Sequence, residues 1–282
     1  IIFRGEDSVK KELTYAELNN KVRETAAALI ESGIKKGDRV AAFMPNMPES
    51  IIAMLASASI GAIWSSTSPD FGIKGVLDRF SQIGPKVIIA ADGYFYKGKV
   101  FDSLEKLDKI LHDLPTVERV VVVKYTEHIE LLNLPKAIWW DDFLKPSTRK
   151  LHFEQLPFDQ PLYIMYSSGT TGLPKSIVHS AGGTLIQHLK ELVLHSNITQ
   201  DQTVFYYTTC GWMMWNWIVS SLAIGSTLVL YDGNPFYPSP EALLQLADEL
   251  NISFFGTSAK YIASLEAAGV EPKKISSFPA LK

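Results

Sequence analysis

Ten consecutive residues, Tyr166–Lys175, combine four small hydroxyl side chains, two glycines and a lysine. Glycines let the backbone bend so that successive N–H groups can point at one anion. The hydroxyl groups add further donors, and Lys175 adds a positive charge. This combination predicts a loop that wraps around phosphate groups. The alternative is a polar hairpin that is simply exposed to solvent.

The spacing nearly matches the P-loop pattern G-x-x-x-x-G-K-[ST], with Pro174 in place of the second glycine. Proline has no N–H to donate, and the residues that follow, Ile177-Val178, are β-branched. A P-loop requires a helix N-terminus at this point. We therefore expect a loop that joins a strand at 162–166 to a strand through Val178 and covers a nucleotide as a flap.

A second constellation, Thr208–Trp217, holds three of the six tryptophans and two of the six methionines. A predicted strand precedes it and a predicted helix follows, which places it at the carboxyl end of a strand, where open α/β sheets bind ligands. Aromatic residues and methionine also fill ordinary cores. From the residues alone, a ligand pocket and plain core packing are equally good interpretations.

The run Ser-Ser-Gly-Thr-Thr-Gly-Leu-Pro-Lys resembles the phosphate loop of the adenylate-forming superfamily, in its acyl-CoA synthetase branch. The resemblance implies an α/β fold of two stacked, mostly parallel sheets flanked by helices. It implies ATP, Mg²⁺ and coenzyme A as reactants. It also implies that the β- and γ-phosphates contact the loop at Ser167, Ser168, Gly169, Thr170, Thr171, Gly172 and Lys175.

Gly211-Trp212 resembles the Gly-Trp of short-chain acyl-CoA synthetases, which implies an acyl pocket lined by Gly211, Trp212, Met213 and Met214. Large side chains shorten such a cavity and exclude long acids. Acetate-activating members read Gly-Trp-x-Thr-Gly-His, and this chain departs from that pattern from Met214 onward. Together with the runs 231–236 and 66–72, the segment resembles the members that activate acetoacetate.

Two lysines in a Gly-rich turn, Lys97 and Lys99, follow the predicted strand 86–91. Their place resembles the basic turn that acetyl-CoA synthetases use against the 3′-phosphate of CoA. Solvated lysines on a loop are the simpler interpretation. No His-Glu-x-x-His, Gly-x-Gly or Gly-x-Ser-x-Gly pattern occurs, so we expect no protein-built metal site, dinucleotide fingerprint or hydrolase elbow.

The composition is that of a globular protein, with 46% hydrophobic and 20% charged residues in a chain of 282. A net charge of −3 without a basic run argues against nucleic acid as a partner. The apolar stretches 51–64 and 217–231 are too short to span a bilayer comfortably. A single cysteine, Cys210, fits a reducing compartment, and we expect the cytosol. Small molecules are the expected partners, and the oligomeric state stays open.

Strands alternate with helices along most of the chain, which predicts βαβ units and parallel sheets. We expect one βα lobe at 1–124, a crossover at 125–160 and a second lobe at 161–282. The predicted strands are 39–44, 62–66, 86–91, 118–123, 162–166, 203–207, 227–231 and 252–255, and the predicted helices are 14–32, 48–60, 73–82, 100–112, 184–195, 215–223, 240–250 and 259–268.

The chain starts at Ile1 and stops at Lys282 in what looks like the approach to another strand. The family's lid domain and its catalytic lysine are expected beyond that point, so we expect a form truncated at both ends that shows partial activity or none. The predicted reaction joins acetoacetate to CoA through an acyl-AMP intermediate. Alternatives are ligation of acetate or propionate, phosphoryl transfer with ADP as product, and nucleotide binding without turnover.

Overall fold

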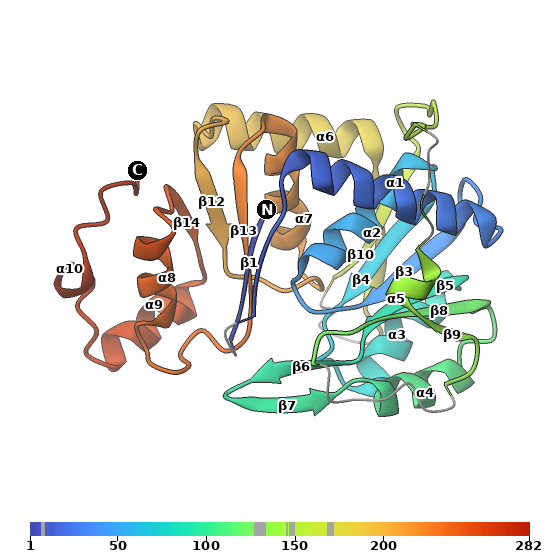
Figure 1. The fold of residues 1–282 in the computed structure, drawn as a ribbon, viewed down its shortest axis with the longest axis horizontal. Helices are drawn as coiled ribbons and strands as arrows, with labels where there is room; N and C mark the ends of the chain where they lie inside the picture. The colour runs from blue at the N-terminus through green and yellow to red at the C-terminus, as the bar shows by residue number, and fades with distance from the viewer. Residues whose placement is uncertain (7–8, 127–133, 145, 147–149, 168–171) are drawn as a thin grey trace.

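Two mainly parallel sheets organise the chain in a computed structural model that describes residues 1–282 except 7–8, 127–133, 145, 147–149 and 168–171 (Figure 1). Among the described residues, seven strands form the first sheet, in the order β11 (Lys175–Ser180), β10 (Pro161–Ser167), β4 (Ile63–Thr67), β3 (Arg39–Phe43), β5 (Val87–Ala91), β8 (Arg119–Val123) and β9 (Ala137–Trp139). The second sheet has the order β14 (Phe254–Gly256), β12 (Thr203–Tyr206), β13 (Thr227–Asp232), β1 (Ile2–Gly5) and β2 (Lys10–Glu12).

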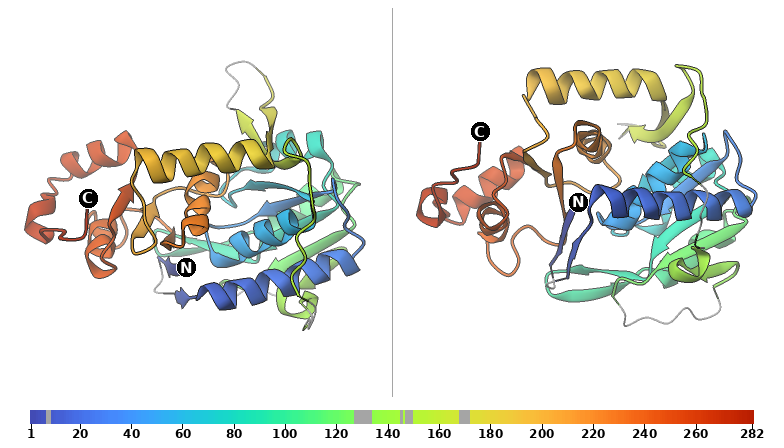
Figure 2. Two further views of the ribbon diagram at one scale, coloured as in Figure 1. Left: turned by 90° about the horizontal axis from the view of Figure 1, so that it is seen from above. Right: turned by 45° about the horizontal axis from the view of Figure 1, so that its top comes forward.

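Helices cover both sheets and are the connections between parallel strands. They are α1 (Tyr15–Glu31), α2 (Pro48–Ser59), α3 (Ile73–Ile83), α4 (Leu104–His112), α5 (Trp140–Phe143), α6 (Ala181–Leu189), α7 (Met213–Val219), α8 (Ala242–Glu249), α9 (Ala259–Ala267) and α10 (Pro272–Ile275). A π-helical turn, η1 (Lys190–His195), continues α6 as one rod, and a 3-10 turn, η2 (Ser220–Ile224), continues α7 (Figure 2). Within the described part of the chain, no helix is both long and apolar enough to cross a bilayer.

The central strands are buried on both faces, as expected for parallel sheets between helices. In β3, Val40 and Ala42 join a core that contacts α1 and α2, whereas Ala41 and Phe43 face α3 and α4. Strand β13 alternates in the same way, with Leu228 and Leu230 in the first of these cores. Because that core contains side chains from both sheets, the two sheets pack against each other through it. This confirms the predicted architecture of stacked sheets and helices.

Local signals explain where several elements begin and end. The side chain of Thr14 accepts from the backbone of Glu17 while the Glu17 carboxylate accepts from Thr14, which is a complete capping box for α1. Gly84 ends α3 in the left-handed conformation, at φ +53°. Pro48 occupies the first turn of α2. These three helix ends were predictable because each depends on neighbouring residues alone.

The sheets do not follow the predicted lobes in chain order. Strand β1, from the predicted first lobe, pairs in parallel with β13 of the second sheet, with Ile2 opposite Val229. Strands β10 and β11, from the predicted second lobe, extend the first sheet, where Tyr163 pairs with Trp64. The strand β9, in the predicted crossover, also extends the first sheet. Each sheet therefore contains strands from both predicted lobes. The division of the chain into these lobes stays a prediction.

The predicted helix 100–112 is wrong over its first residues. The segment Lys99–Asp102 is strand β7, which pairs with β6 (Gly93–Tyr96) in an antiparallel hairpin, and α4 starts only at Leu104. Lys99, Val100, Phe101 and Asp102 are all exposed on one arm of this hairpin, whereas the apolar face of α4 is buried. The hairpin extends toward the end of β1 (Figure 1).

The buried side chain of Asn46 joins the two sheets at the carboxyl ends of their strands. Asn46, which follows β3, donates to the backbone oxygens of Thr208 and Tyr231, each at 3.4 Å. Its amide oxygen accepts from the indole N–H of Trp215 at 2.9 Å. Only 3% of Asn46 is exposed, so these groups have no access to bulk water as a substitute partner.

We expect Asn46→Ala to lower the free energy of unfolding by about 2 kcal/mol, because it leaves the buried indole N–H and two carbonyls without a partner. Urea unfolding followed by tryptophan fluorescence measures this change. Asn20→Ala, at an exposed position of α1, is the matched control and should change the same quantity by less than about 0.5 kcal/mol. Equal effects of the two substitutions would show that Asn46 does not hold the sheets together.

Candidate functional site

The predicted flap joins two antiparallel strands, which confirms that the segment is not a P-loop followed by a helix. Strands β10 and β11 pair from Pro161 opposite Ser180 to Ser167 opposite Lys175. Four predicted phosphate-binding residues, Ser168, Gly169, Thr170 and Thr171, lie outside the described residues. The described ends of the flap are therefore Ser167 on one strand and Gly172–Lys175 on the other.

The described flap residues suit an anion-binding role by conformation and exposure. Gly172 has a φ of +105°, which favours glycine, and a Cβ built on it meets nothing within 4 Å. Lys175 is exposed at the start of β11, so its ammonium group can reach a ligand in solvent. Ser167 is half-buried at the end of β10. Whether these residues bind phosphate stays a prediction.

The turn after β12 lies against the loop after β4. A Cβ on Gly211 would lie 3.2 Å from the ring of Phe71 and 3.6 Å from the backbone nitrogen of Ser68, so only glycine fits without movement. Next to it, the hydroxyl of Ser66 donates to the backbone oxygen of Cys210 at 2.7 Å. These contacts bring the carboxyl end of β4, from the first sheet, against the predicted acyl segment of the second sheet.

The four predicted acyl-pocket residues have different environments. Trp212 and Met213 are 59% and 50% exposed, so their side chains are available to a ligand. Met214 is half-buried and packs on the shared core. The next residue, Trp215, is fully buried and stacks on Trp64 with ring centroids 6.5 Å apart. Core packing therefore starts at Met214, whereas a ligand-binding role of the exposed Trp212 and Met213 stays a prediction.

Met213 lines a cavity of about 460 Å³ between β10, β11 and α6, with Met165, His179, Thr184 and His188 among its other residues. The Nδ1 atom of His188 lies 2.9 Å from the hydroxyl of Ser220. Burial lowers the pKa of His188, which favours the neutral imidazole with one donor and one acceptor. The carboxylate of Glu191 also lines the cavity, which therefore combines apolar walls with polar groups and one acidic group. Met165 in its wall lies two residues before Ser167, where the flap begins.

Cys210 is buried and its thiol donates to the backbone oxygen of Pro45 at 3.2 Å. Burial raises the pKa of the thiol well above its ordinary value, so almost none of it is thiolate near neutral pH. Cys210 is therefore a buried packing residue and not an activated nucleophile.

The two predicted CoA-binding lysines lie at the tip of the β6–β7 hairpin. Lys97 has a φ of +54°, and both Lys97 and Lys99 are exposed. The carboxylate of Glu6 accepts from the backbone N–H of Gly98 and from that of Asn234, which ties the tip to the loop after β13. The hairpin therefore presents two cations at a defined place, and their proposed ligand is untested.

A cavity of about 360 Å³ lies between this hairpin and the turn after β12, with Tyr94, Tyr207, Asp70 and Asp232 in its lining. Burial raises the pKa of Asp232 to about 7, and the negative charges of Glu6 and Asp70 contribute to this increase. The hydroxyl of Tyr125 donates to the Asp232 carboxylate at 3.1 Å and opposes this increase. Sequence reasoning missed Asp232. Its place directly after a predicted strand, within the run 231–236 noted above, was the available signal.

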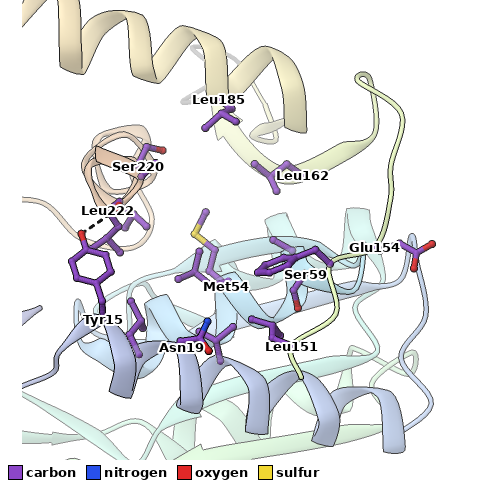
Figure 3. Close-up of a pocket in the computed structure, with 17 residues that line it drawn as sticks. Tyr15, Asn19, Met54, Ser59, Leu151, Glu154, Leu162, Leu185, Ser220 and Leu222 are labelled. Carbon is purple, nitrogen blue, oxygen red and sulfur yellow. Dashed lines mark hydrogen bonds between the residues drawn. The ribbon is translucent and has the colours of Figure 1, made fainter. Parts of the chain in front are cut away.

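A further cavity, of about 480 Å³, is lined mainly by apolar side chains of α1, α2, β10 and η2 (Figure 3). Leu162, Leu185 and Met54 point into it, and none of its lining residues is a lysine or arginine. It contains none of the predicted site residues. Across the residues that the structure describes, no group of three or more His, Cys, Asp or Glu could hold a metal ion.

The whole of the described fold has counterparts among known proteins. Residues 2–282 match the family described as AMP-binding enzyme. The chain belongs to the AMP-binding enzyme family. Among its relatives, it is 52% identical to the rat acetoacetyl-CoA synthetase, over 95% of this chain and 41% of the rat protein. The corresponding protein of Rhizobium meliloti (strain 1021) is 50% identical, over 100% of this chain and 44% of its own length.

A solved structure of this family, acetoacetyl-CoA synthetase from Streptomyces lividans, superimposes on the whole chain with a TM-score of 0.94 and 40% identity, over 43% of its own chain. A malonamoyl-CoA synthetase of Penicillium aethiopicum is 41% identical to this chain. The match covers 93% of this chain and 39% of the Penicillium protein. The chain thus spans about two fifths of the length of the AMP-binding enzymes that it matches.

We expect Asp232→Asn to change how stability depends on pH. Because the folded pKa, about 7, exceeds that of an unfolded aspartate, the folded state binds the extra proton and Asp232 makes the free energy of unfolding fall as pH rises from about 4 to about 7. The asparagine of the variant cannot bind this proton and so does not contribute to the pH dependence. Between pH 5 and pH 8, the free energy of unfolding of the variant should rise relative to that of wild type by on the order of 2 kcal/mol.

Urea unfolding at both pH values measures this gain, and Asp113→Asn, at an exposed helix end, is the control. A pH dependence that is the same in wild type and Asp232→Asn would show that the Asp232 carboxyl group ionises normally.

Proposed function

We propose that this chain supplies the nucleotide flap and the acid-binding turn for the ATP-dependent ligation of acetoacetate to CoA. The observation that carries the proposal is that half of its residues are identical to those of acetoacetyl-CoA synthetases from an animal and a bacterium, over 95% and 100% of the chain. The contact between Gly211 and the loop after β4 supports it, because both segments lie at carboxyl ends of strands.

In the first half-reaction, a carboxylate oxygen of acetoacetate attacks the α-phosphorus of ATP and the bond to the β-phosphate breaks, which gives acetoacetyl-AMP and pyrophosphate. The carboxylate and the triphosphate repel each other, so the site must neutralise charge and hold the attacking oxygen in line. Lys175 supplies positive charge, and Ser167 with the flap residues 168–172 supplies donors. Magnesium would be held mainly by the phosphate oxygens and would neutralise further charge.

In the second half-reaction, the sulfur of CoA attacks the acyl carbon, the thiol proton is lost and AMP departs. Trp212 and Met213 form one wall of the acid site, next to the cavity that Met213 shares with Met165. Lys97 and Lys99 bind the phosphate of CoA at the hairpin tip. The single cysteine, buried and reduced, fits the cytosol as the place of this reaction.

A second candidate substrate is malonamate, which the relative from Penicillium aethiopicum suggests by its name. Acetoacetate and malonamate are both short acids with a carbonyl group on the third carbon. Butyrate has the same chain length as acetoacetate without that carbonyl, and acetate is shorter. Comparing these four acids separates recognition of the carbonyl group from recognition of size.

We expect ATP–pyrophosphate exchange to be fastest with acetoacetate, and at least tenfold slower with butyrate and with acetate, because a site that hydrogen-bonds a carbonyl loses a partner when it is missing. The assay uses the 282-residue chain and, in parallel, a chimera that continues from Lys282 with the corresponding remainder of the rat relative. In a second reaction that also contains CoA, AMP and ADP are separated by liquid chromatography. Exchange that is fastest with acetate, or ADP as the product, would contradict the proposal.

We expect Lys175→Ala to weaken binding of Mg-ATP to the chain by about tenfold, which corresponds to the loss of one charge-assisted contact to phosphate. Binding of adenosine should stay unchanged, because it has no phosphate. Isothermal titration calorimetry measures both affinities. Lys260→Ala, at an exposed position of α9, is the control. Equal losses in the two variants would remove Lys175 from the nucleotide site.

A further inference from the structure

Helix α3 contacts the base of the flap on both sides of Lys175. The side-chain nitrogen of Gln82 donates to the backbone oxygen of Pro174 at 2.8 Å. Its side-chain oxygen accepts from the hydroxyl of Ser176 at 2.9 Å. The second N–H of the same amide donates to the backbone oxygen of Asp78 within the helix. One side chain therefore holds the residues before and after Lys175, and it is itself held by its own helix.

One turn earlier on the same face, Arg79 contacts the other end of the flap. Its guanidinium lies 4.8 Å from the ring centroid of Phe71 and 5.6 Å from that of Tyr166, the residue before Ser167. A bond of 2.7 Å from its Nη1 atom to the backbone oxygen of Gly75 fixes the orientation of the group. Helix α3 thus contacts both strands at the point where the flap leaves the sheet.

This placement matters because Lys175 is the first residue of β11. Among the residues that the structure describes, the pair of Ser167 and Lys175 is the last one between β10 and β11. The lysine side chain is exposed and has four rotatable bonds, so only its backbone can be restrained before a ligand arrives. Bonds to both neighbours provide that restraint.

We infer that Gln82 is a positioning residue for Lys175: by fixing the backbone at Pro174 and Ser176, it sets where the ammonium group can meet the phosphates of ATP. The inference rests on the proposed function for the identity of the ligand. The restraint of the backbone by Gln82 is independent of the proposed function and can be measured without nucleotide.

The test compares Gln82→Met, which removes all three bonds at similar size, with Gln245→Met, an exposed glutamine of α8 that bonds within its own helix. We expect Gln82→Met to weaken binding of Mg-ATP about fivefold while adenosine binding is unchanged, and Gln245→Met to leave both unchanged. Equal melting temperatures establish that the variants are folded. Gln82→Glu, which keeps the acceptor and loses the donors, replaces Gln82→Met if that variant does not fold.

A double-mutant cycle with Lys175→Ala separates positioning from general stabilisation. If Gln82 acts through Lys175, Gln82→Met has no further effect on ATP affinity once Lys175 is alanine. The same fivefold loss in both backgrounds, or no loss in either, overturns the inference. If wild type does not bind Mg-ATP, the proposed function fails instead.

Hydrogen exchange of the unliganded chain then decides the inference independently. Of the consecutive amides of Lys175 and Ser176, only one bonds to β10, because β11 is an antiparallel edge strand. We expect that amide to exchange about tenfold faster in Gln82→Met than in wild type, because local opening of the strand end becomes easier. Unchanged exchange at this amide would show that Gln82 does not restrain the flap, whatever the nucleotide result.

Discussion

The arrangement of the candidate site depends on how the carboxyl ends of the two sheets are joined, and Asn46 makes that joint. Its amide group bonds to the ends of β12 and β13 and to the indole of Trp215, the residue where the acyl segment enters the core. A buried polar group with all its partners in place is stabilising and specific, since any shift of one sheet leaves donors or acceptors unpaired. Near this joint, Gly211 contacts the loop after β4 and the hydroxyl of Ser66 bonds to the backbone oxygen of Cys210.

The proposed site residues lie on three segments, each of which is held by a neighbouring element. The flap is held by α3, the hairpin tip by Glu6, and the turn after β12 by Ser66 and Phe71. In every case a side chain from one element bonds or packs against the backbone of another. Such contacts position a loop while leaving its own side chains free to meet a ligand, which the proposed site for two anionic substrates would require.

Much of the fold was predictable from the sequence, because parallel strands between helices leave local patterns. The buried run at Val87–Ala91 and the capping box at Thr14 are examples. The flap was also recognisable, since Pro174 and the β-branched residues after it exclude a helix. The pairing of β1 with β13 was not predictable, because no local pattern states which distant strand will be its neighbour. The β6–β7 hairpin was missed because Val100–His112 has a helical pattern, and Asp232 and Asn46 gain their roles only from residues far away in the chain.

The parallel pairing of β1 with β13 also bears on how the chain is made. Ile2 leaves the ribosome long before Val229, its partner in the sheet. At typical rates of synthesis, the interval is roughly ten to forty seconds. During that time the edge of β1 has only the short antiparallel strand β2 beside it, and its apolar residue Phe3 has no completed second sheet to pack into. Assembly of the second sheet is therefore a late event in the folding of each molecule, whereas β3, β4 and β5 can associate as soon as they emerge.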